Sequence, residues 1–480
     1  MRSPLPTSSH CTEKFRFTPG AAPANGFRRV LLLAAPLLFV FPTLNPMNAS
    51  SQEFQPNYDE SKIPPYVLPD PLLTASGDRV TSPEQWTARR AETIELFENH
   101  VFGRMPAERN VDAKVVRRDP TINDGNTIRY ELTVTIHPLK ASTTTKPKSL
   151  EIHVLADVPK LPDSGGDEGQ NSSGPYPAFL GLNFHGNHTV SSDPAIRIPS
   201  SWVPDRGSQT TDGHRATERG RGVAASRWPN RMINGAGYAV ITAYCGDIDP
   251  DFDDGFQNGL HALMPDYVES LPPDQRPGTI AAWSYGLSCI LDAVAATEEL
   301  NIDASNVALI GHSRLGKTSL WAGATDTRFA AVISNNSGCG GAALSRRAFG
   351  ETVARINRNF PHWFCKGFHH YDQRESELPV DSHQLIAMAA PRPIAVGSAV
   401  DDQWADPRGE FLASLHASPV YEVLGLAGLR DEENQTPSDL PVVDDAFSSG
   451  TISYHLRTGK HDLKESDWKR YIRFLDRFLK

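Results

Sequence analysis

The sequence predicts an α/β protein whose sheet is mostly parallel, with antiparallel strands at its N-terminal edge. From about residue 176 onward, short apolar runs alternate with segments long enough for helices, which is typical of a parallel sheet covered by helices. Residues 112–158 instead alternate apolar and polar side chains, which is typical of antiparallel strands with one solvated face. The run Val307–Ile310 is the clearest buried strand, because it is apolar throughout and ends at Gly311.

Length and composition agree with one large globular domain. The chain has 480 residues, of which 39% are hydrophobic and 22% are charged. Single α/β domains with insertions reach this length, and no internal repeat divides the chain. We therefore expect one domain over residues 50–480, and a monomer. The net charge of −10 argues against a nucleic-acid partner.

Residues 1–49 predict an export signal rather than part of the fold. Arg28 and Arg29 precede an apolar stretch, and small and polar residues follow it through Ala49. A membrane span needs about twenty apolar residues, so a cleaved signal is favoured over a retained membrane anchor, which is the alternative. We expect cleavage near Ala49 and a secreted or periplasmic protein. No later segment is expected to be apolar enough to span a bilayer.

Cysteine usage permits disulfides without requiring them. The sequence contains five cysteines, and Cys11 would leave with the signal, so four remain in the domain. An even number in an exported protein is compatible with disulfide pairing. We hypothesise a bridge between Cys339 and Cys365, which lie close in sequence. No C-x-x-C motif is present, so we expect no structural zinc and no metal site.

The N-terminal part of the domain predicts an arm and then a helix. Residues 52–75 are rich in proline and polar residues, which favours an extended arm laid over the domain. Ser82 followed by Pro83 is typical of a helix N-cap and first helical position. The helix is expected to run to about His100, with an inward apolar stripe of Ile94, Phe97 and Val101.

The next buried strand, Tyr176–Phe184, leads directly into the loop His185–His188. Gly186 in this loop has no Cβ, so the backbone there can approach a ligand closely. The loop is therefore a candidate for backbone N–H donation to a substrate. The alternative is an ordinary polar turn.

An acidic loop follows the strand predicted over 239–244. Residues 245–255 contain five aspartates, but their spacing does not fit an EF-hand, so we expect a solvated loop rather than a calcium site. A helix predicted over 227–238 precedes this strand. A longer helix over 279–296 then leads to the run at Val307.

Ser313 lies on the predicted strand-to-helix turn that follows this run, with the helix expected from Lys317. In the three-layer α/β-hydrolase fold, such a turn presents a nucleophile, and the next backbone N–H faces the developing oxyanion. The G-x-S-x-G pattern is partly met: Gly311 is in place, but Leu315 occupies the second glycine position and Gly316 follows it. An ordinary turn serine is the alternative.

A nucleophilic serine needs an imidazole to accept its proton and a carboxylate to orient that imidazole. In α/β-hydrolases these partners follow the serine in the order acid and then histidine, on loops at the carboxyl ends of late strands. His461 lies in such a loop, after the last predicted strand at Ser453–Leu456. It is therefore the candidate base.

Two earlier strand ends could supply the acid. The first ends in two amides, Asn335 and Asn336, which cannot stabilise an imidazolium by charge. The second follows the strand predicted over 389–397 and is therefore favoured. It offers three carboxylates, Asp401, Asp402 and Asp406.

Seven short segments extend this pattern: Gly311–Lys317, Asn336–Ala343, Phe360–Trp363, Leu378–His383, Ala390–Arg392, Trp404–Gly409 and His461–Trp468. Together they resemble the glucuronoyl esterases of carbohydrate esterase family fifteen, in their bacterial branch. The resemblance covers roughly residues 60–480. The combination of G-x-S-R-x-G-K with the Trp-Ala-Asp-Pro loop is more specific than the elbow alone, and it accounts for the displaced glycine.

The resemblance implies hydrolysis of the ester between 4-O-methyl-glucuronic acid on xylan and a lignin alcohol, without a metal or organic cofactor. It makes Ser313 the nucleophile, by way of an acyl-enzyme, and His461 the base. Asp402 matches the acid position of bacterial members, and Asp401 remains the alternative because adjacent acids cannot be separated by spacing. Two departures are His312, where fungal members have cysteine, and Asn336, where many members have glutamate.

The resemblance also implies a substrate pocket. Arg314 would serve the oxyanion hole through its backbone N–H and its guanidinium, and Lys317 would donate hydrogen bonds to sugar hydroxyls. Glu351 and Trp404 would line the glucuronate pocket. From the residues alone, Lys317 and Glu351 could instead lie on solvated surfaces, whereas Trp404, in a polar loop bounded by proline, favours a pocket position.

Two other functions remain open from the sequence. The first is an acetyl-xylan or other carbohydrate esterase on the same scaffold, since an elbow and triad specify acyl transfer and not the acid recognised. Lys317, Glu351 and Trp404 argue against it. The second is a carbohydrate-binding protein without catalysis, for which the amide at Asn336 would be a sign of decay.

Overall fold

The computed structural model describes residues 55–139, 149–160, 174–205 and 210–480. Residues 54–480 form one compact unit by their contacts. The predicted export signal, its cleavage near Ala49 and the alternative membrane anchor lie outside the described residues.

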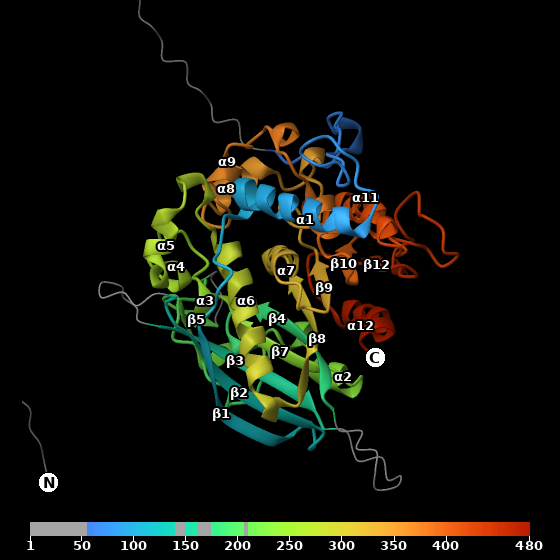
Figure 1. The fold of residues 1–480 in the computed structure, drawn as a ribbon. Helices are drawn as coiled ribbons and strands as arrows, with labels where there is room; N and C mark the ends of the chain where they lie inside the picture. The colour runs from blue at the N-terminus through green and yellow to red at the C-terminus, as the bar shows by residue number, and fades with distance from the viewer. Residues whose placement is uncertain (1–54, 140–148, 161–173, 206–209) are drawn as a thin grey trace, which may run out of the picture. The chain divides into compact units, whose positions relative to one another are not determined.

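A ten-stranded sheet crosses the described part of the chain in the order β1-β2-β3-β7-β4-β8-β9-β10-β12-β11 (Figure 1). The six strands from β7 to β12 are parallel. Strands β1, β2 and β3 are antiparallel and join the sheet through β7, as predicted. The bounds are β1 Val111–Ile122, β2 Thr127–Ile136, β3 Leu150–Pro159, β4 Tyr176–Asn183, β7 Ala239–Tyr244, β8 Ile302–His312, β9 Ala331–Asn335, β10 Ile394–Ala399, β11 Asp445–Phe447 and β12 Ile452–Arg457.

The opposite edge of the sheet carries one more antiparallel strand, β11, which the sequence did not predict. It has three residues, too few for an alternating pattern to stand out. A separate two-stranded ribbon pairs β5, Thr211–Asp212, with β6, Arg215–Ala216.

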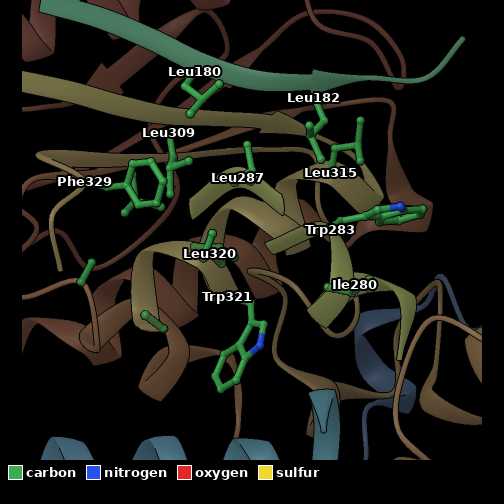
Figure 2. Close-up of a cluster of buried hydrophobic side chains, with 14 of the residues drawn as sticks. Leu180, Leu182, Ile280, Trp283, Leu287, Leu309, Leu315, Leu320, Trp321 and Phe329 are labelled. Carbon is green, nitrogen blue, oxygen red and sulfur yellow. The ribbon is translucent and has the colours of Figure 1, made fainter. Parts of the chain in front are cut away.

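Helices cover both faces of the sheet, which makes the three layers expected of an α/β-hydrolase. Alternate residues of a strand point to opposite faces. In β4 and β8, Leu180 and Leu309 therefore face α6, Thr279–Ala296, and α7, Arg314–Thr325 (Figure 2). Phe179 and Ile310 face the other way, into a second cluster that includes residues of α2, Asn230–Gly235, and α12, Glu465–Leu479.

Helix α6 corrects one expectation about membrane spans. It is long and apolar enough to cross a bilayer, yet 83% of that 18-residue window is buried inside the domain. Figure 2 shows Trp283 and Leu287 of this helix in the cluster beneath β4. The apolar composition therefore serves the core.

The N-terminal helix forms as predicted. Helix α1, Pro83–Phe97, begins at Ser82, whose side chain accepts a hydrogen bond from the Gln85 N–H. A π-helical turn, Glu98–Phe102, follows, and Phe97 and Val101 are buried.

Helices differ from prediction mainly at their ends. Helix α7 begins at Arg314, directly after the serine, instead of at Lys317, and α2 is shorter than the predicted span 227–238. The remaining helices are α3 Cys245–Ile248, α4 Gly259–Leu263, α5 Pro265–Ser270, α8 Val353–Asn359, α9 Lys366–His369, α10 Ser382–Ala387 and α11 Pro407–Val423.

Candidate active site

Ser313 occupies a strained turn between β8 and α7. Its backbone has φ 58° and ψ −132°, a conformation that costs a non-glycine residue on the order of 1–3 kcal/mol. A Cβ added at Gly311 would lie 1.9 Å from the Leu315 carbonyl oxygen, so only glycine fits there. At Gly316 an added Cβ would lie 3.0 Å from the Ser337 Cβ. The second close approach of the elbow is thus at Gly316, while Leu315 is buried in the core.

His461 and Asp402 meet beside this turn. The His461 Nδ1 lies 2.6 Å from the Asp402 Oδ2, and the ring centroid of His461 is 4.5 Å from that of His312, the neighbour of Ser313. The Asp402 side chain is 4% exposed and that of His461 is 40% exposed. Since Nδ1 contacts the carboxylate, Nε2 is the ring nitrogen left to accept a proton from a nucleophile.

Backbone contacts hold the two loops together. The Asp401 N–H donates to the Gly459 carbonyl, and its side chain is exposed, so of the two adjacent acids it is Asp402 that contacts the histidine. Buried Arg457, at the end of β12, donates to the Lys460 and Asp462 carbonyls on either side of His461. The histidine loop is therefore positioned from inside the protein.

The amide at the first strand end contributes to this arrangement. Asn336 has φ 47° and is buried, and its side-chain amide donates to the Asp402 Oδ2 at 2.8 Å. The carboxylate oxygen that contacts His461 thus accepts a second hydrogen bond. A glutamate at position 336 would instead bring a second negative charge beside Asp402, which is unfavourable at short range.

Arg314 begins α7, and its guanidinium is buried. The first N–H groups of a helix have no partner within the helix, which suits the Arg314 N–H to an oxyanion. The guanidinium Nε lies 2.7 Å from the Asp251 carboxylate, and its carbon lies 4.5 Å from the Phe184 ring centroid.

Asp251 is the counter-ion that sequence reasoning missed. Burial acts to raise its pKa, but the charge of Arg314 and hydrogen bonds from His362 and Trp363 outweigh this effect and hold the pKa well below its usual range. The Trp363 indole donates to Asp251 at 2.8 Å. The carboxylate is therefore ionised and holds the Arg314 side chain in place.

Lys317 and Glu351 form a buried polar pair one helical turn from Ser313. The Lys317 Nζ donates to the Ser337 and Cys339 carbonyls, both at 2.6 Å, and to Glu351 at 3.2 Å. Their side chains are 3% and 8% exposed, so neither lies on a solvated surface. The Glu351 N–H donates to the Trp404 carbonyl, which places the half-buried Trp404 beside them.

The loop His185–His188 does not offer the Gly186 N–H to a substrate. That N–H donates to the Asn183 side chain at 2.8 Å. A Cβ at this glycine would lie 2.6 Å from Pro199, so the residue allows a tight turn here. His188 is buried, and burial lowers its pKa to about 4.

Comparison with known proteins identifies the family. The curated carbohydrate esterase MZ0003, from an unknown prokaryotic organism, is 45% identical over 428 residues, which are 88% of this chain and 92% of that protein. A solved structure of a promiscuous CE15 esterase from a marine bacterial metagenome is 44% identical, with a TM-score of 0.77 over 88% of this chain and 100% of that one. The chain belongs to carbohydrate esterase family 15.

Other relatives of this family 15 chain carry more specific names. The family description "Glucuronyl esterase, fungi" matches residues 270–425. A solved glucuronoyl esterase from Solibacter usitatus is 36% identical, with a TM-score of 0.74 over 87% of this chain and 99% of that one. The 4-O-methyl-glucuronoyl methylesterase 1 of Wolfiporia cocos is 26% identical over 84% of this chain and 83% of its own length.

The acidic loop of this family 15 member is solvated only in part, contrary to prediction: Asp253 is exposed, but three other aspartates have buried side chains. Asp247 and Asp249 are buried, and the Asp251 side chain is 3% exposed. Each has a partner: Ser201 donates to Asp247, His261 contacts Asp249, and Arg314 pairs with Asp251. All three partners lie outside the loop in sequence, so spacing within the loop could not reveal them.

The hypothesis of a Cys339–Cys365 bridge is wrong for this structure. Both thiols are free and buried, as are Cys245 and Cys289. Cys339 contacts the Ser345 hydroxyl. Cys365 is the residue before the first turn of α9, and its backbone N–H donates to the Val101 carbonyl. Burial raises the pKa of both thiols, so they act as small apolar side chains.

A second missed carboxyl lies beneath the site. Glu410 of α11 is fully buried, and one of its oxygens accepts the Ser337 and Gly338 N–H groups at 2.7 and 3.0 Å. The Ser398 hydroxyl contacts the other oxygen. Burial raises the pKa of Glu410 to about 8.

Among the described residues, no group of three or more histidine, cysteine, aspartate or glutamate side chains could hold a metal ion.

Proposed function

We propose that this protein is a serine esterase that hydrolyses esters of glucuronic acid. The observation that carries the proposal is the His461–Asp402 contact beside the strained Ser313 turn. Ser313 would attack the ester carbonyl while His461 accepts its proton, and the imidazolium would then protonate the departing alcohol. Water would release the acid from the acyl-enzyme by the same route in reverse.

The substrate class rests on the relatives and on the buried polar pair of Lys317 and Glu351 beside Trp404. Solved and curated relatives are named glucuronoyl esterase and 4-O-methyl-glucuronoyl methylesterase. Lys317, Glu351 and Trp404 would hold the sugar, because an acetyl group has neither hydroxyls nor a ring for such side chains to contact. We propose that the natural ester joins 4-O-methyl-glucuronic acid of xylan to lignin alcohols, and that the enzyme is exported.

The test compares wild type and Ser313→Ala on benzyl glucuronate, acetylated xylan and a simple acetyl ester. Wild type is expected to prefer benzyl glucuronate, and Ser313→Ala is expected to lower kcat on the order of 10⁶-fold with unchanged far-UV circular dichroism. Preference for acetyl esters would overturn the substrate class. The solved relative described as promiscuous makes this outcome worth measuring directly. Full activity in Ser313→Ala would overturn the mechanism.

A further inference from the structure

Residues 55–63 are part of the arm predicted over residues 52–75, and below they alone are called the arm. They pass beside the proposed sugar site. The carbonyl oxygen of Asn57 accepts a hydrogen bond from the Gly350 N–H at 2.8 Å. The next amide along, that of Glu351, donates to the Trp404 carbonyl at 2.9 Å. The first bond fixes the arm to Gly350, the neighbour of Glu351, and the second fixes Glu351 to the Trp404 loop.

A buried arginine fastens the arm in this position. The Arg347 guanidinium contacts Glu60 of the arm at 2.6 Å and Asp406 at 2.8 Å, and its side chain is 3% exposed. Asp406 caps α11 and follows Trp404 in the same loop. Such charge-assisted hydrogen bonds are short and directional, so the arm and the Trp404 loop are held in fixed register. Figure 1 shows the N-terminal segment beside α11.

Tyr58 is the side chain that this anchoring presents. Its ring lies edge-on to that of Phe349, with centroids 6.0 Å apart, yet the residue remains 49% exposed. Burial and the charge of Asp402 both raise the pKa of Tyr58, so the phenol is neutral and can donate a hydrogen bond at neutral pH. An exposed tyrosine held beside the proposed sugar site combines an apolar face with a polar tip, which suits it to a sugar ring.

Resting on the proposed function, we propose that Tyr58 contacts the carbohydrate part of the ester, and that Glu60 and Arg347 position it. The contact is assigned to the pyranose ring, or to the sugar attached to it, because the arm is bonded to Gly350, next to Glu351, and is linked through Arg347 to Asp406 of the Trp404 loop. Tyr58 would thus extend the pocket on the side of the polysaccharide and would act on binding rather than on acyl transfer.

The test uses three substrates and three variants. The substrates are methyl glucuronate, benzyl glucuronate, and the benzyl ester of glucuronate carried on a xylo-oligosaccharide. Tyr58→Ala is expected to raise KM about tenfold for both the methyl and the benzyl ester, and by at least as much for the oligosaccharide. The kcat of this variant should stay within about twofold of that of wild type. Tyr58→Phe should recover most of the affinity. Phe478→Ala removes a similarly exposed aromatic from α12 and should change nothing.

The outcomes separate this proposal from the proposed function. If wild type cleaves glucuronate esters but Tyr58→Ala leaves KM within twofold on all three, the Tyr58 assignment is overturned alone. A KM increase that appears only with the benzyl alcohol overturns it as well, since the contact would then be with the alcohol. If wild type cleaves none of the three, both proposals fall together.

The positioning role of Glu60 has its own readout. Glu60→Ala should raise KM by about the same factor as Tyr58→Ala, because the arm loses its ionic anchor. The KM of the double variant, Tyr58→Ala with Glu60→Ala, should be no higher than that of either single variant, because the effects of residues that act through one contact are not additive. Val67→Ala, an 87% exposed site farther along the same segment, is the control. Fully additive effects would overturn the positioning role.

Discussion

His455 and His461 each contact a buried aspartate at nearly the same distance, but they use opposite ring nitrogens. On β12, His455 contacts Asp467 through Nε2 at 2.8 Å, and its side chain is 1% exposed. In the loop that follows, His461 contacts Asp402 through Nδ1 at 2.6 Å and is 40% exposed. A histidine–aspartate contact is therefore not in itself the mark of a catalytic base.

The difference lies in which nitrogen remains accessible. At His461 the bound Nδ1 leaves Nε2 for a substrate or nucleophile, whereas at His455 the bound nitrogen is Nε2 and burial removes the rest of the ring from solvent. Burial lowers the pKa of His455 despite Asp467, so that ring is neutral. Asp467 also accepts a hydrogen bond from Arg457, which anchors the loop that carries His461. One pair would do chemistry, and the other supports the loop that carries it.

Exchanging each histidine for glutamine gives the largest expected contrast. His461→Gln should lower kcat on benzyl glucuronate on the order of 10⁵–10⁶-fold while leaving the free energy of unfolding nearly unchanged. His455→Gln should cost about 1–3 kcal/mol of stability, because it disturbs a buried hydrogen bond, while kcat per folded molecule changes far less. Urea unfolding and steady-state kinetics check both. Equal losses of kcat in the two variants would remove the distinction.

The acid of the pair can be separated from its neighbour. Asp402→Asn should lower kcat about 10⁴-fold, because the amide no longer stabilises the imidazolium. Asp401→Asn is the matched control, since that side chain is exposed and only its backbone N–H joins the histidine loop. Its kcat should stay within about threefold of wild type. A large loss at Asp401 would move the acid there.

Local sequence pattern was sufficient to predict the elbow and the longer strands of the sheet, but not the contacts between residues that lie far apart in the chain. Gly311 and the apolar run before Ser313 predicted the turn because strand period and turn chemistry are properties of neighbouring residues. Whether Asp401 or Asp402 faces the histidine depends on the backbone of the turn, which spacing does not reveal. The burial of Asp251 depends on Arg314, which comes much later in the chain, so composition suggested a solvated loop.

Asp251 and Arg314 form a second buried pair that supports the site, as His455 and Asp467 do. Asp251→Asn should cost about 3–5 kcal/mol of stability near neutral pH, because it leaves a buried guanidinium without its counter-charge. The lowered pKa of Asp251 contributes stability above the pKa of the unfolded chain, and that contribution is lost as the pH falls. The deficit of the variant should therefore shrink between about pH 5 and pH 2.

The control for this prediction is Asp253→Asn, a change at an exposed aspartate of the same loop. Its stability should match that of wild type at each pH within about 0.5 kcal/mol. A deficit of Asp251→Asn that stays constant down to pH 2 would show that the lost interaction is packing rather than charge.

Glu410 is a buried carboxyl whose contacts are all inside the protein. Of the substitutions considered, a change at Glu410 should have the smallest effect. Its pKa in the folded protein is raised to about 8, so the folded state binds more protons than the unfolded chain below that pH, and wild-type stability should fall as the pH rises toward 8. Glu410→Gln keeps the shape and cannot ionise. Between pH 6 and pH 8, the stability of wild type relative to this variant should fall by about 1–3 kcal/mol. A stability difference that is independent of pH would mean that the carboxylate is already ionised at pH 6, held by the Ser337 and Gly338 amides, and that hydrogen bonding rather than burial decides its charge.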